Sequence, residues 1–249
     1  MAGQKDLVIG GLHAARTALT RAGGDVLEVW LRRDREAGPL RDIEAAARAL
    51  GVTVQLVDPP TLDRLYGDDH HQGVVLRRRP PATVELDTVL ARAATAGRAP
   101  LLLVLDNVQD PRNFGACLRV ADGAGVDAVL FTRDRSARLG NVVAKTASGA
   151  LDCVALVAVP NLASALRQLA AAGVWTLGAA HDGPVSLWQA DLRLPSALVL
   201  GNEGEGLRRL TRERCDQLIH IPMHGAVASL NVATAAAVCL FEARRQRGG

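Results

Sequence analysis

The chain has 249 residues, of which 49% are hydrophobic, and a formal net charge of +3. This length suits one large domain or two small ones with a sizeable core. No stretch of about 18 apolar residues occurs, so we expect no transmembrane helix and no membrane partner. The first residues lack the positive region and apolar stretch of a secretory signal, and we therefore expect a cytoplasmic protein.

Cysteine, histidine and arginine patterns narrow the choice further. The four cysteines contain no C-x-x-C pair, which favours reduced, mostly buried thiols, and none of the six histidines has metal-ligand spacing, so we expect no metal. Lys5 and Lys145 are the only lysines, while arginines cluster at 77–79 and 208–209. Arginine suits contacts with phosphates and bases. A genome rich in G and C explains the same excess, so the charges favour RNA binding without establishing it.

Residues 7–78 have the pattern of a small α/β unit. The stretch at 77–81, rich in arginine and proline, breaks this pattern and begins a connection. We place a linker at 79–98, which separates predicted domains at 1–78 and 99–249. The predicted strands cover 7–9, 26–31, 52–57 and 73–76, and the predicted helices cover 11–21, 39–50, a short segment after Pro60, and 87–96 in the linker.

From residue 101 onward, apolar strands alternate with helices. This alternation predicts a doubly wound α/β domain, with a mostly parallel sheet covered on both faces. Ligands bind such sheets beyond the carboxyl ends of the strands. The predicted strands are 101–105, 127–131, 153–158, 174–178, 197–201 and 218–221, and the predicted helices are 113–124, 161–172, 206–214 and 230–246.

Three segments of the second domain run from the end of a predicted strand into a loop that opens a helix. Glycine-rich loops of this kind leave backbone N–H and C=O groups free to hold a ligand. In their order and spacing, the three segments resemble the signature motifs of the SpoU/TrmH family of RNA ribose 2′-O-methyltransferases. They read Leu-Asp-Asn-Val-Gln-Asp-Pro-Arg-Asn-Phe-Gly-Ala-Cys-Leu-Arg-Val-Ala-Asp (105–122), Gly-Asn-Glu-Gly-Glu-Gly-Leu (201–207) and Ile-Pro-Met-His-Gly-Ala-Val-Ala-Ser-Leu-Asn-Val (221–232).

This resemblance implies a fold and an activity. The second domain would be a SPOUT domain with a deep trefoil knot, which general topology rules alone make improbable. The stretches 9–14 and 71–75 resemble the L30e-like RNA substrate-binding domain of two-domain family members. S-adenosylmethionine would be the methyl donor, and a guanosine of 23S ribosomal RNA, free or in a ribosome assembly precursor, would be the substrate. The family's use of the helix at 230–246 implies a homodimer.

The resemblance also assigns roles to catalytic residues. Arg119 would bind the RNA phosphate and lower the pKa of the 2′-hydroxyl. A guanidinium holds its proton too tightly to serve easily as a base. Asn113 and Asn231 would contact substrate, although capping of the following helices is an alternative. Glu203 would orient Arg119 or the ribose, although a helix dipole also favours a carboxylate there. Ser229 would face the substrate or the methyl donor.

The donor site is expected at the second and third motifs. Backbone groups of Gly201, Ile221 and Leu230 match the family's S-adenosylmethionine contacts. Met223 would pack on the adenine.

Three alternative functions remain. A transfer-RNA ribose 2′-O-methyltransferase is the nearest, but such enzymes usually lack an L30e-like domain. A non-catalytic RNA-binding protein that retains the fold is disfavoured by the intact motif residues. A dinucleotide-dependent oxidoreductase needs G-x-G-x-x-G after the first strand with an acidic residue about 20 positions on, and the glycine loop at 201–206 lies too late in the chain with the wrong spacing.

Overall fold

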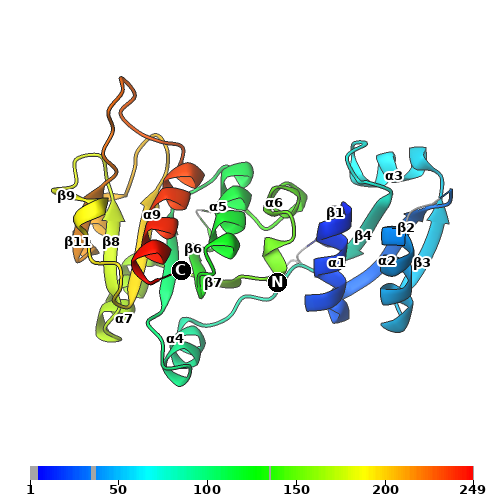
Figure 1. Cartoon of the computed structure of the whole chain (residues 1–249), viewed down its shortest axis with the longest axis horizontal. Helices are drawn as coiled ribbons and strands as arrows, with labels where there is room; N and C mark the ends of the chain where they lie inside the picture. The colour runs from blue at the N-terminus through cyan, green and yellow to red at the C-terminus, as the bar shows by residue number, and fades with distance from the viewer. Residues whose placement is uncertain (1–4, 35–37, 135, 249) are drawn as a thin grey trace. The chain divides into compact units, whose positions relative to one another are not determined.

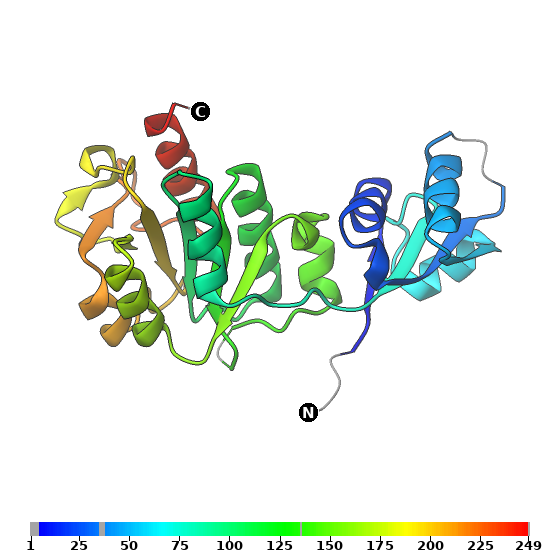
Figure 2. The ribbon, with the colours of Figure 1, turned by 90° about the horizontal axis from the view of Figure 1, so that it is seen from below.

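A computed structural model describes residues 5–34, 38–134 and 136–248. The chain divides into two compact units, each shown in Figures 1 and 2. The first unit combines Met1–Pro81 with Leu139–Cys153, and the second combines Ala82–Arg138 with Val154–Gly249. Residues 1–4 and 249, at the ends of the predicted domains, lie outside the described residues. The division at 78 and 99 stays a prediction, because compactness does not show which part folds alone.

The first unit contains a four-stranded mixed sheet in the order β1-β4-β2-β3. Strand β4 runs antiparallel to both of its neighbours, and β2 and β3 are parallel. The third helix shows clear end signals: the Asp58 side chain accepts the Thr61 N–H at 3.2 Å, and Gly67 ends the helix at φ 90°. The elements are β1 (Leu7–Gly10), α1 (Leu12–Arg21), β2 (Val26–Arg32), α2 (Gly38–Ala49), β3 (Thr53–Val57), α3 (Pro59–Tyr66) and β4 (Val74–Arg78).

A segment from the middle of the chain belongs to this first unit. It contains α6 (Asn141–Ala147), followed by a 3₁₀ turn at Ala150–Asp152. The Asn141 side chain accepts the Val8 N–H at 2.9 Å, and Lys145 pairs with Asp68 while its Nζ lies 4.9 Å from the centre of the Tyr66 ring. Helix α6 was not predicted, because the stretch is short and ends at Ser148 and Gly149.

Two arginines of the 77–79 cluster are engaged within the first unit. Arg78 forms an ion pair with Asp152, and both side chains are only 1% exposed. Arg77 pairs with Asp6 at 3.5 Å and with Glu28 at 3.3 Å. A row of arginines on a strand is thus divided between a buried pair and surface pairs.

The second unit contains a seven-stranded sheet in the order β7-β6-β5-β10-β8-β11-β9, and every pairing is parallel. The predicted doubly wound α/β fold is confirmed, whereas the trefoil knot stays a prediction. The strands are β5 (Leu101–Asp106), β6 (Ala128–Thr132), β7 (Ala155–Val159), β8 (Trp175–Ala179), β9 (Val185–Ser186), β10 (Ser196–Gly201) and β11 (Gln217–His220). The helices are α4 (Leu86–Thr95), α5 (Pro111–Gly123), α7 (Leu162–Ala171), α8 (Arg209–Arg214) and α9 (Val232–Gln246).

Helices cover both faces of this sheet. Residues of α4 and α7 pack against alternate strand residues such as Leu102, Val104 and Val199 in one buried cluster. Helices α5 and α9 pack side by side (Figure 1), and the Phe114 ring of α5 meets Phe131 of β6 at a centroid distance of 5.1 Å. Each such fully buried side chain stabilises the fold by roughly 1.5–3 kcal/mol. The described part of the chain contains no helix that is long and apolar enough to cross a membrane.

Candidate active site

The first motif follows β5, at the carboxyl edge of the parallel sheet. Asp110 caps α5, because its Oδ1 accepts the N–H groups of Arg112 at 2.6 Å and Asn113 at 3.1 Å, and Pro111 occupies the first helical turn. Capping by Asn113 is therefore the wrong interpretation. The Asn113 side chain is free to point away from its own helix.

Asn113, Glu203 and Asn231 meet in one hydrogen-bonded cluster, which brings together residues of all three motifs. The Asn113 amide donates to Glu203 Oε1 at 2.7 Å, and the Asn231 amide donates to Asn113 Oδ1 at 3.0 Å and also to Glu203 Oε1. Asn231 additionally caps α9, since its Oδ1 accepts the Ala233 N–H at 3.0 Å. Glu203 lies in a loop and α8 begins only at Arg209, so helix-dipole complementarity does not explain this carboxylate.

A pocket of about 310 Å³ lies between the second and third motifs. All four residues predicted to bind the cofactor line it, and so do Glu203 and Ser229. Its size falls within the range of small-molecule sites. The lining includes Ala179, Leu200, Gly201, Glu203, Glu205, Ile221, Met223, Ser229 and Leu230.

The loop after β10 shapes one side of this pocket. Asn202 and Gly206 form a β-bridge, with the Asn202 N–H donating to the Gly206 carbonyl at 3.1 Å and the Gly206 N–H returning the bond at 2.8 Å. Gly206 has φ 67°, a backbone conformation that residues other than glycine rarely adopt. A Cβ on Gly201 would lie 2.1 Å from the Gly206 carbonyl group, so only glycine fits there.

The charges around the pocket are mainly negative. Glu203 and Glu205 line it, while the one arginine in its lining, Arg212, forms two 2.8 Å bonds with Asp182. The bond from Arg212 lowers the pKa of Asp182. Cys117 of α5 is buried, and this burial, followed by the negative charge of Glu203, raises the pKa of its thiol to about 12. Cys117 therefore stays a neutral thiol. Because Glu203 and Glu205 line the pocket, it suits a positively charged ligand.

The structure does not bring Arg119 to the cluster within one chain. Arg119 is exposed on α5, and it forms no hydrogen bond or ion pair with the residues that the structure describes. Six residues of α-helix separate it from Asn113, which corresponds to about 9 Å along the axis and roughly 120° around it. The two side chains therefore face different directions.

Sequence reasoning missed two residues at the same edge of the sheet. Asp106 is fully buried at the end of β5, and its carboxylate accepts from the Arg208 Nε at 2.6 Å and the Arg208 backbone N–H at 3.0 Å. Asn202 links the first two motifs, as described below. The 208–209 arginine cluster is thus partly structural, because Arg208 is bonded to Asp106. An acidic residue at the end of an apolar strand was the available signal.

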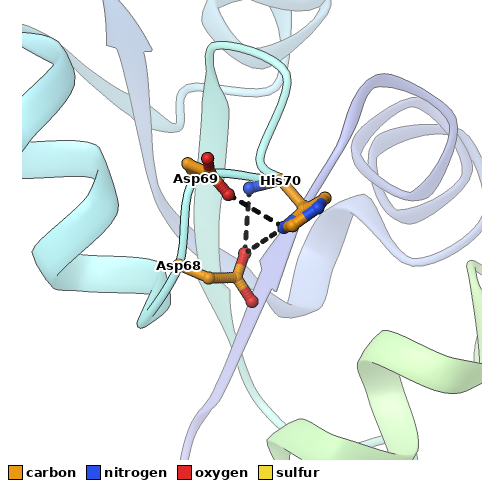
Figure 3. A group of neighbouring side chains, drawn as sticks. All are labelled: Asp68, Asp69 and His70. Atoms are coloured by element: carbon orange, nitrogen blue, oxygen red, sulfur yellow. Dashed lines mark hydrogen bonds and ion pairs between the residues drawn. The ribbon is translucent and has the colours of Figure 1, made fainter.

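A group of possible metal ligands lies in the first unit. Asp68, Asp69 and His70 bring ligand atoms within 4.8 Å of one another (Figure 3), with His70 Nδ1 at 2.9 Å from Asp69 and 3.6 Å from Asp68. The other oxygen of Asp68 pairs with Lys145, and bonds from Lys145 and the His70 backbone N–H lower the pKa of Asp68. Lys145 and the His70 ring thus pair with these two carboxylates, of which only Asp69 is exposed. The absence of a metal stays a prediction.

Comparison with known proteins identifies both parts of the chain. Residues 100–241 match the SpoU rRNA Methylase family, and residues 8–84 match the family described as RNA 2′-O ribose methyltransferase substrate binding. The chain is 45% identical to the 23S rRNA (guanosine-2′-O-)-methyltransferase RlmB of Pectobacterium atrosepticum, over 97% of this chain and 99% of the relative. It is 46% identical to RlmB of Ralstonia nicotianae, over 98% of this chain and 97% of the relative.

Solved structures agree with this grouping. The SpoU methyltransferase AviRb from Streptomyces viridochromogenes, in complex with the cofactor AdoMet, matches with a TM-score of 0.81 and 26% identity, covering 98% of this chain and 91% of that one. The A. aeolicus TrmH/SpoU tRNA modifying enzyme matches with a TM-score of 0.55 and 29% identity, covering 66% of this chain and 84% of that one. The similarity to the second structure thus leaves a third of this chain unmatched.

Proposed function

Because this chain belongs to the SpoU rRNA methylase family, we propose that it transfers a methyl group from S-adenosylmethionine to the ribose 2′-hydroxyl of a guanosine in 23S ribosomal RNA. The observation that supports this most directly is the meeting of Asn113, Glu203 and Asn231 beside a pocket lined by Gly201, Ile221, Met223 and Leu230. Relatives that match over nearly the full length bear the name of this activity.

The pocket fits the proposed donor. Apolar side chains such as Ile221 and Met223 suit the adenine, and the close approach of the backbone at Gly201 and Gly206 leaves room for a ligand at the loop. Glu203 and Glu205 supply negative charge on the pocket wall. The donor supplies an activated methyl group on a positively charged sulfur, and such a charge is stabilised by nearby carboxylates.

Each residue of the cluster has a task in the proposed transfer. Glu203 fixes the amide groups of Asn113 and Asn231, so that the second N–H of the Asn113 amide is held in place for the ribose. Ser229 lines the same pocket and presents a hydroxyl to the donor or the ribose. Alignment of the reacting groups of this kind contributes about 7–11 kcal/mol to catalysis.

Arg119 supplies the RNA side of the site. Its exposed guanidinium binds the phosphate beside the target ribose, and its positive charge lowers the pKa of the 2′-hydroxyl. Because Arg119 faces away from Asn113 on α5, a homodimer offers a second arrangement, in which Arg119 serves the pocket of the other chain. The exposed Phe241 on α9, beside α5, gives this surface an apolar side chain for such a dimer.

The substrate is ribosomal RNA, free or in an assembly precursor, and the protein acts in the cytoplasm where ribosomes are assembled. A transfer-RNA substrate is the alternative. The substrate-binding match at residues 8–84 favours ribosomal RNA, because the tRNA modifying enzyme covers only 66% of this chain.

Methyl transfer to isolated RNA tests the proposal. The chain is incubated with tritiated S-adenosylmethionine and either unmodified large-subunit rRNA or bulk tRNA, and the labelled ribose is mapped. Label on a guanosine 2′-oxygen of rRNA alone supports the proposal. Label on tRNA alone moves the substrate to transfer RNA, and donor binding without transfer to rRNA, tRNA or ribosomal precursor particles indicates a non-catalytic protein.

A mixture of two inactive variants tests the dimer. Arg119→Ala and Glu203→Ala are unfolded and refolded together, so that half of the dimers combine one chain of each. If Arg119 serves the pocket of the other chain, these mixed dimers have one intact site and recover activity. No recovery means that Arg119 and Glu203 act in the same chain.

A further inference from the structure

Asn202 joins the first and second motifs, although it was assigned no role from the sequence. It follows β10 directly and precedes Glu203. Its backbone N–H and carbonyl form the bridge with Gly206, its Oδ1 accepts the Gly204 N–H at 2.8 Å, and its Nδ2 donates to the Asn107 carbonyl at 3.2 Å. Each polar atom of Asn202 therefore has at least one hydrogen-bond partner.

The partner of this bond is itself a constrained residue. Asn107 follows β5 and has φ 61°, in the left-handed region that few residues other than glycine adopt. Its side chain accepts a bond from Gln109 at 3.1 Å, and three residues later Asp110 caps α5. The position of the Asn107 carbonyl is thus coupled to the start of the helix that contains Asn113.

The two ends of this connection are the two halves of the catalytic cluster. On one side, Asn202 fixes the Gly204 N–H and so the loop that holds Glu203. On the other side, its Nδ2 donates to the Asn107 carbonyl, in the segment that leads to Asn113. The direct bond from Asn113 to Glu203, at 2.7 Å, joins two side chains, whereas the Asn202 side chain bonds to the backbone of both segments, at the Asn107 carbonyl and the Gly204 N–H.

From this geometry we propose that Asn202 is a positioning residue that sets Glu203 against Asn113 for methyl transfer. The inference rests on the proposed function and names a residue that acts through Glu203. It does not require Asn202 to touch the RNA. Loss of its bond to Asn107 lets the second-motif loop shift relative to the first motif, and a displacement of about 1 Å at a reacting group lowers the rate by about 100-fold.

The substitution Asn202→Asp isolates the connecting bond. Aspartate has nearly the same shape and keeps the acceptor for the Gly204 N–H, but it replaces the donor that faces the Asn107 carbonyl by a second acceptor. Asn202→Ala removes both bonds. We expect Asn202→Asp to lower kcat by about 30–100-fold. Asn202 itself lines the pocket, but aspartate keeps its shape there, so the Kd of the donor should change by less than about threefold.

Asn161→Ala is the matched control. Asn161 caps α7 in the same unit and makes two local bonds, to the N–H groups of Ala163 at 2.8 Å and Ser164 at 3.4 Å. Its loss weakens the fold by a comparable amount, about 1 kcal/mol, without touching either motif. Asn161→Ala is expected to keep kcat within about twofold, so a rate loss from general destabilisation would appear there as well.

A double-mutant cycle decides whether Asn202 acts through Glu203. In a Glu203→Gln background, Asn202→Asp should lower kcat by less than about threefold, because there is no carboxylate left to position. Losses that multiply in the double variant overturn the proposal. So does a kcat within twofold of the parent for Asn202→Asp, a donor Kd that rises as much as kcat falls, or an equal rate loss in Asn161→Ala.

A second readout does not depend on turnover. The side-chain amide NMR signals of Asn113 and Asn231, both donors to Glu203, should shift in Asn202→Asp and stay in place in Asn161→Ala. Unshifted signals overturn the proposal. If the parent chain transfers methyl to none of rRNA, tRNA and ribosomal precursor particles, the proposed function fails, and these signals still report whether Asn202 sets the position of Glu203.

Discussion

The two units use their charged and polar side chains in opposite ways. In the first unit, the side chains of Arg78 and Asp152 are each 1% exposed and form an ion pair inside the fold. In the second unit, Glu203 is exposed and accepts bonds from two neutral amides, those of Asn113 and Asn231, beside an open pocket. The charges of a buried ion pair are used within the fold, whereas a carboxylate that accepts bonds from neutral donors keeps its negative charge available for a ligand.

This difference predicts that substitutions will separate into two classes. Changes to ion pairs of the first unit should lower the free energy of unfolding and leave the chemistry of the folded molecule intact. Changes to the cluster of Asn113, Glu203 and Asn231 should lower the rate of methyl transfer and leave stability almost unchanged.

Asp152→Ala should have the largest effect. It leaves the buried Arg78 guanidinium without its partner, which lowers the free energy of unfolding by about 3–5 kcal/mol. Urea unfolding measures this loss. The exposed pair of Asp191 with Arg193 provides the control, and Asp191→Ala should cost less than about 1 kcal/mol. Equal losses for the two variants would show that the pair of Arg78 with Asp152 is not buried in solution.

Glu203→Gln should lower kcat by about 100- to 1,000-fold, which is typical for loss of one group that stabilises the transition state. Glutamine keeps an acceptor for the two amides but removes the charge, so the free energy of unfolding should change by less than about 0.5 kcal/mol. Single-turnover transfer at saturating donor measures the rate. Glu205→Gln, in the same pocket wall, is the control and should cost less than tenfold; an unchanged rate in Glu203→Gln contradicts the role of the cluster.

Gly201→Ala tests the donor pocket itself. The added Cβ would meet the Gly206 carbonyl group at 2.1 Å, and the displaced loop should destabilise the fold by about 1–3 kcal/mol. We expect the donor Kd, measured by calorimetry, to rise at least about tenfold, equivalent to about 1.4 kcal/mol. Gly24→Ala has open space around the new methyl group and should change neither quantity. Unchanged donor affinity in Gly201→Ala would place the donor elsewhere.

Lys145→Met should have the smallest effect. The pair of Lys145 with Asp68 is partly exposed, so its loss should cost about 0.2–1 kcal/mol at pH 7. Because Lys145 lowers the folded-state pKa of Asp68, the difference from the parent is full above the ordinary carboxyl pKa and disappears as the pH falls below about 4. Thermal unfolding between pH 3 and 7 measures it, with Lys5→Met as control. A difference that grows at low pH contradicts this assignment.

Much of the fold follows from the alternation of apolar strands with helices. The apolar stretch 101–105 and its successors define the parallel sheet, and the loops at the ends of β5 and β10 indicate where a ligand binds. The motifs also identify Asn113, Glu203 and Asn231, because their spacing is characteristic of a family. Their mutual hydrogen bonds require the segments after β5, β10 and β11 to meet, although β8 lies between β10 and β11, and only the folded sheet determines this.

The sequence does not reveal which polar residues form ion pairs and hydrogen bonds within the fold. Arg78 stands in a run of three arginines that indicates a surface for RNA, yet its partner Asp152 is 74 residues away in the sequence. Asn202 shows the reverse, because a small polar residue in a glycine loop has no distinctive pattern until the Asn107 carbonyl is placed beside it. The direction of Arg119 depends on the helix phase relative to Asn113, and its role in one chain or two stays a proposal.

The composition of the first unit from two separate stretches has a consequence for synthesis on the ribosome. When Pro81 has left the exit tunnel, Arg78 still lacks Asp152, and the unit lacks the 139–153 segment. The 74 residues from Arg78 to Asp152 take roughly 4–15 s at about 5–20 residues per second. During that interval Arg78 lacks its counter-charge, and residues 82–138 of the second unit are made before the first unit is complete.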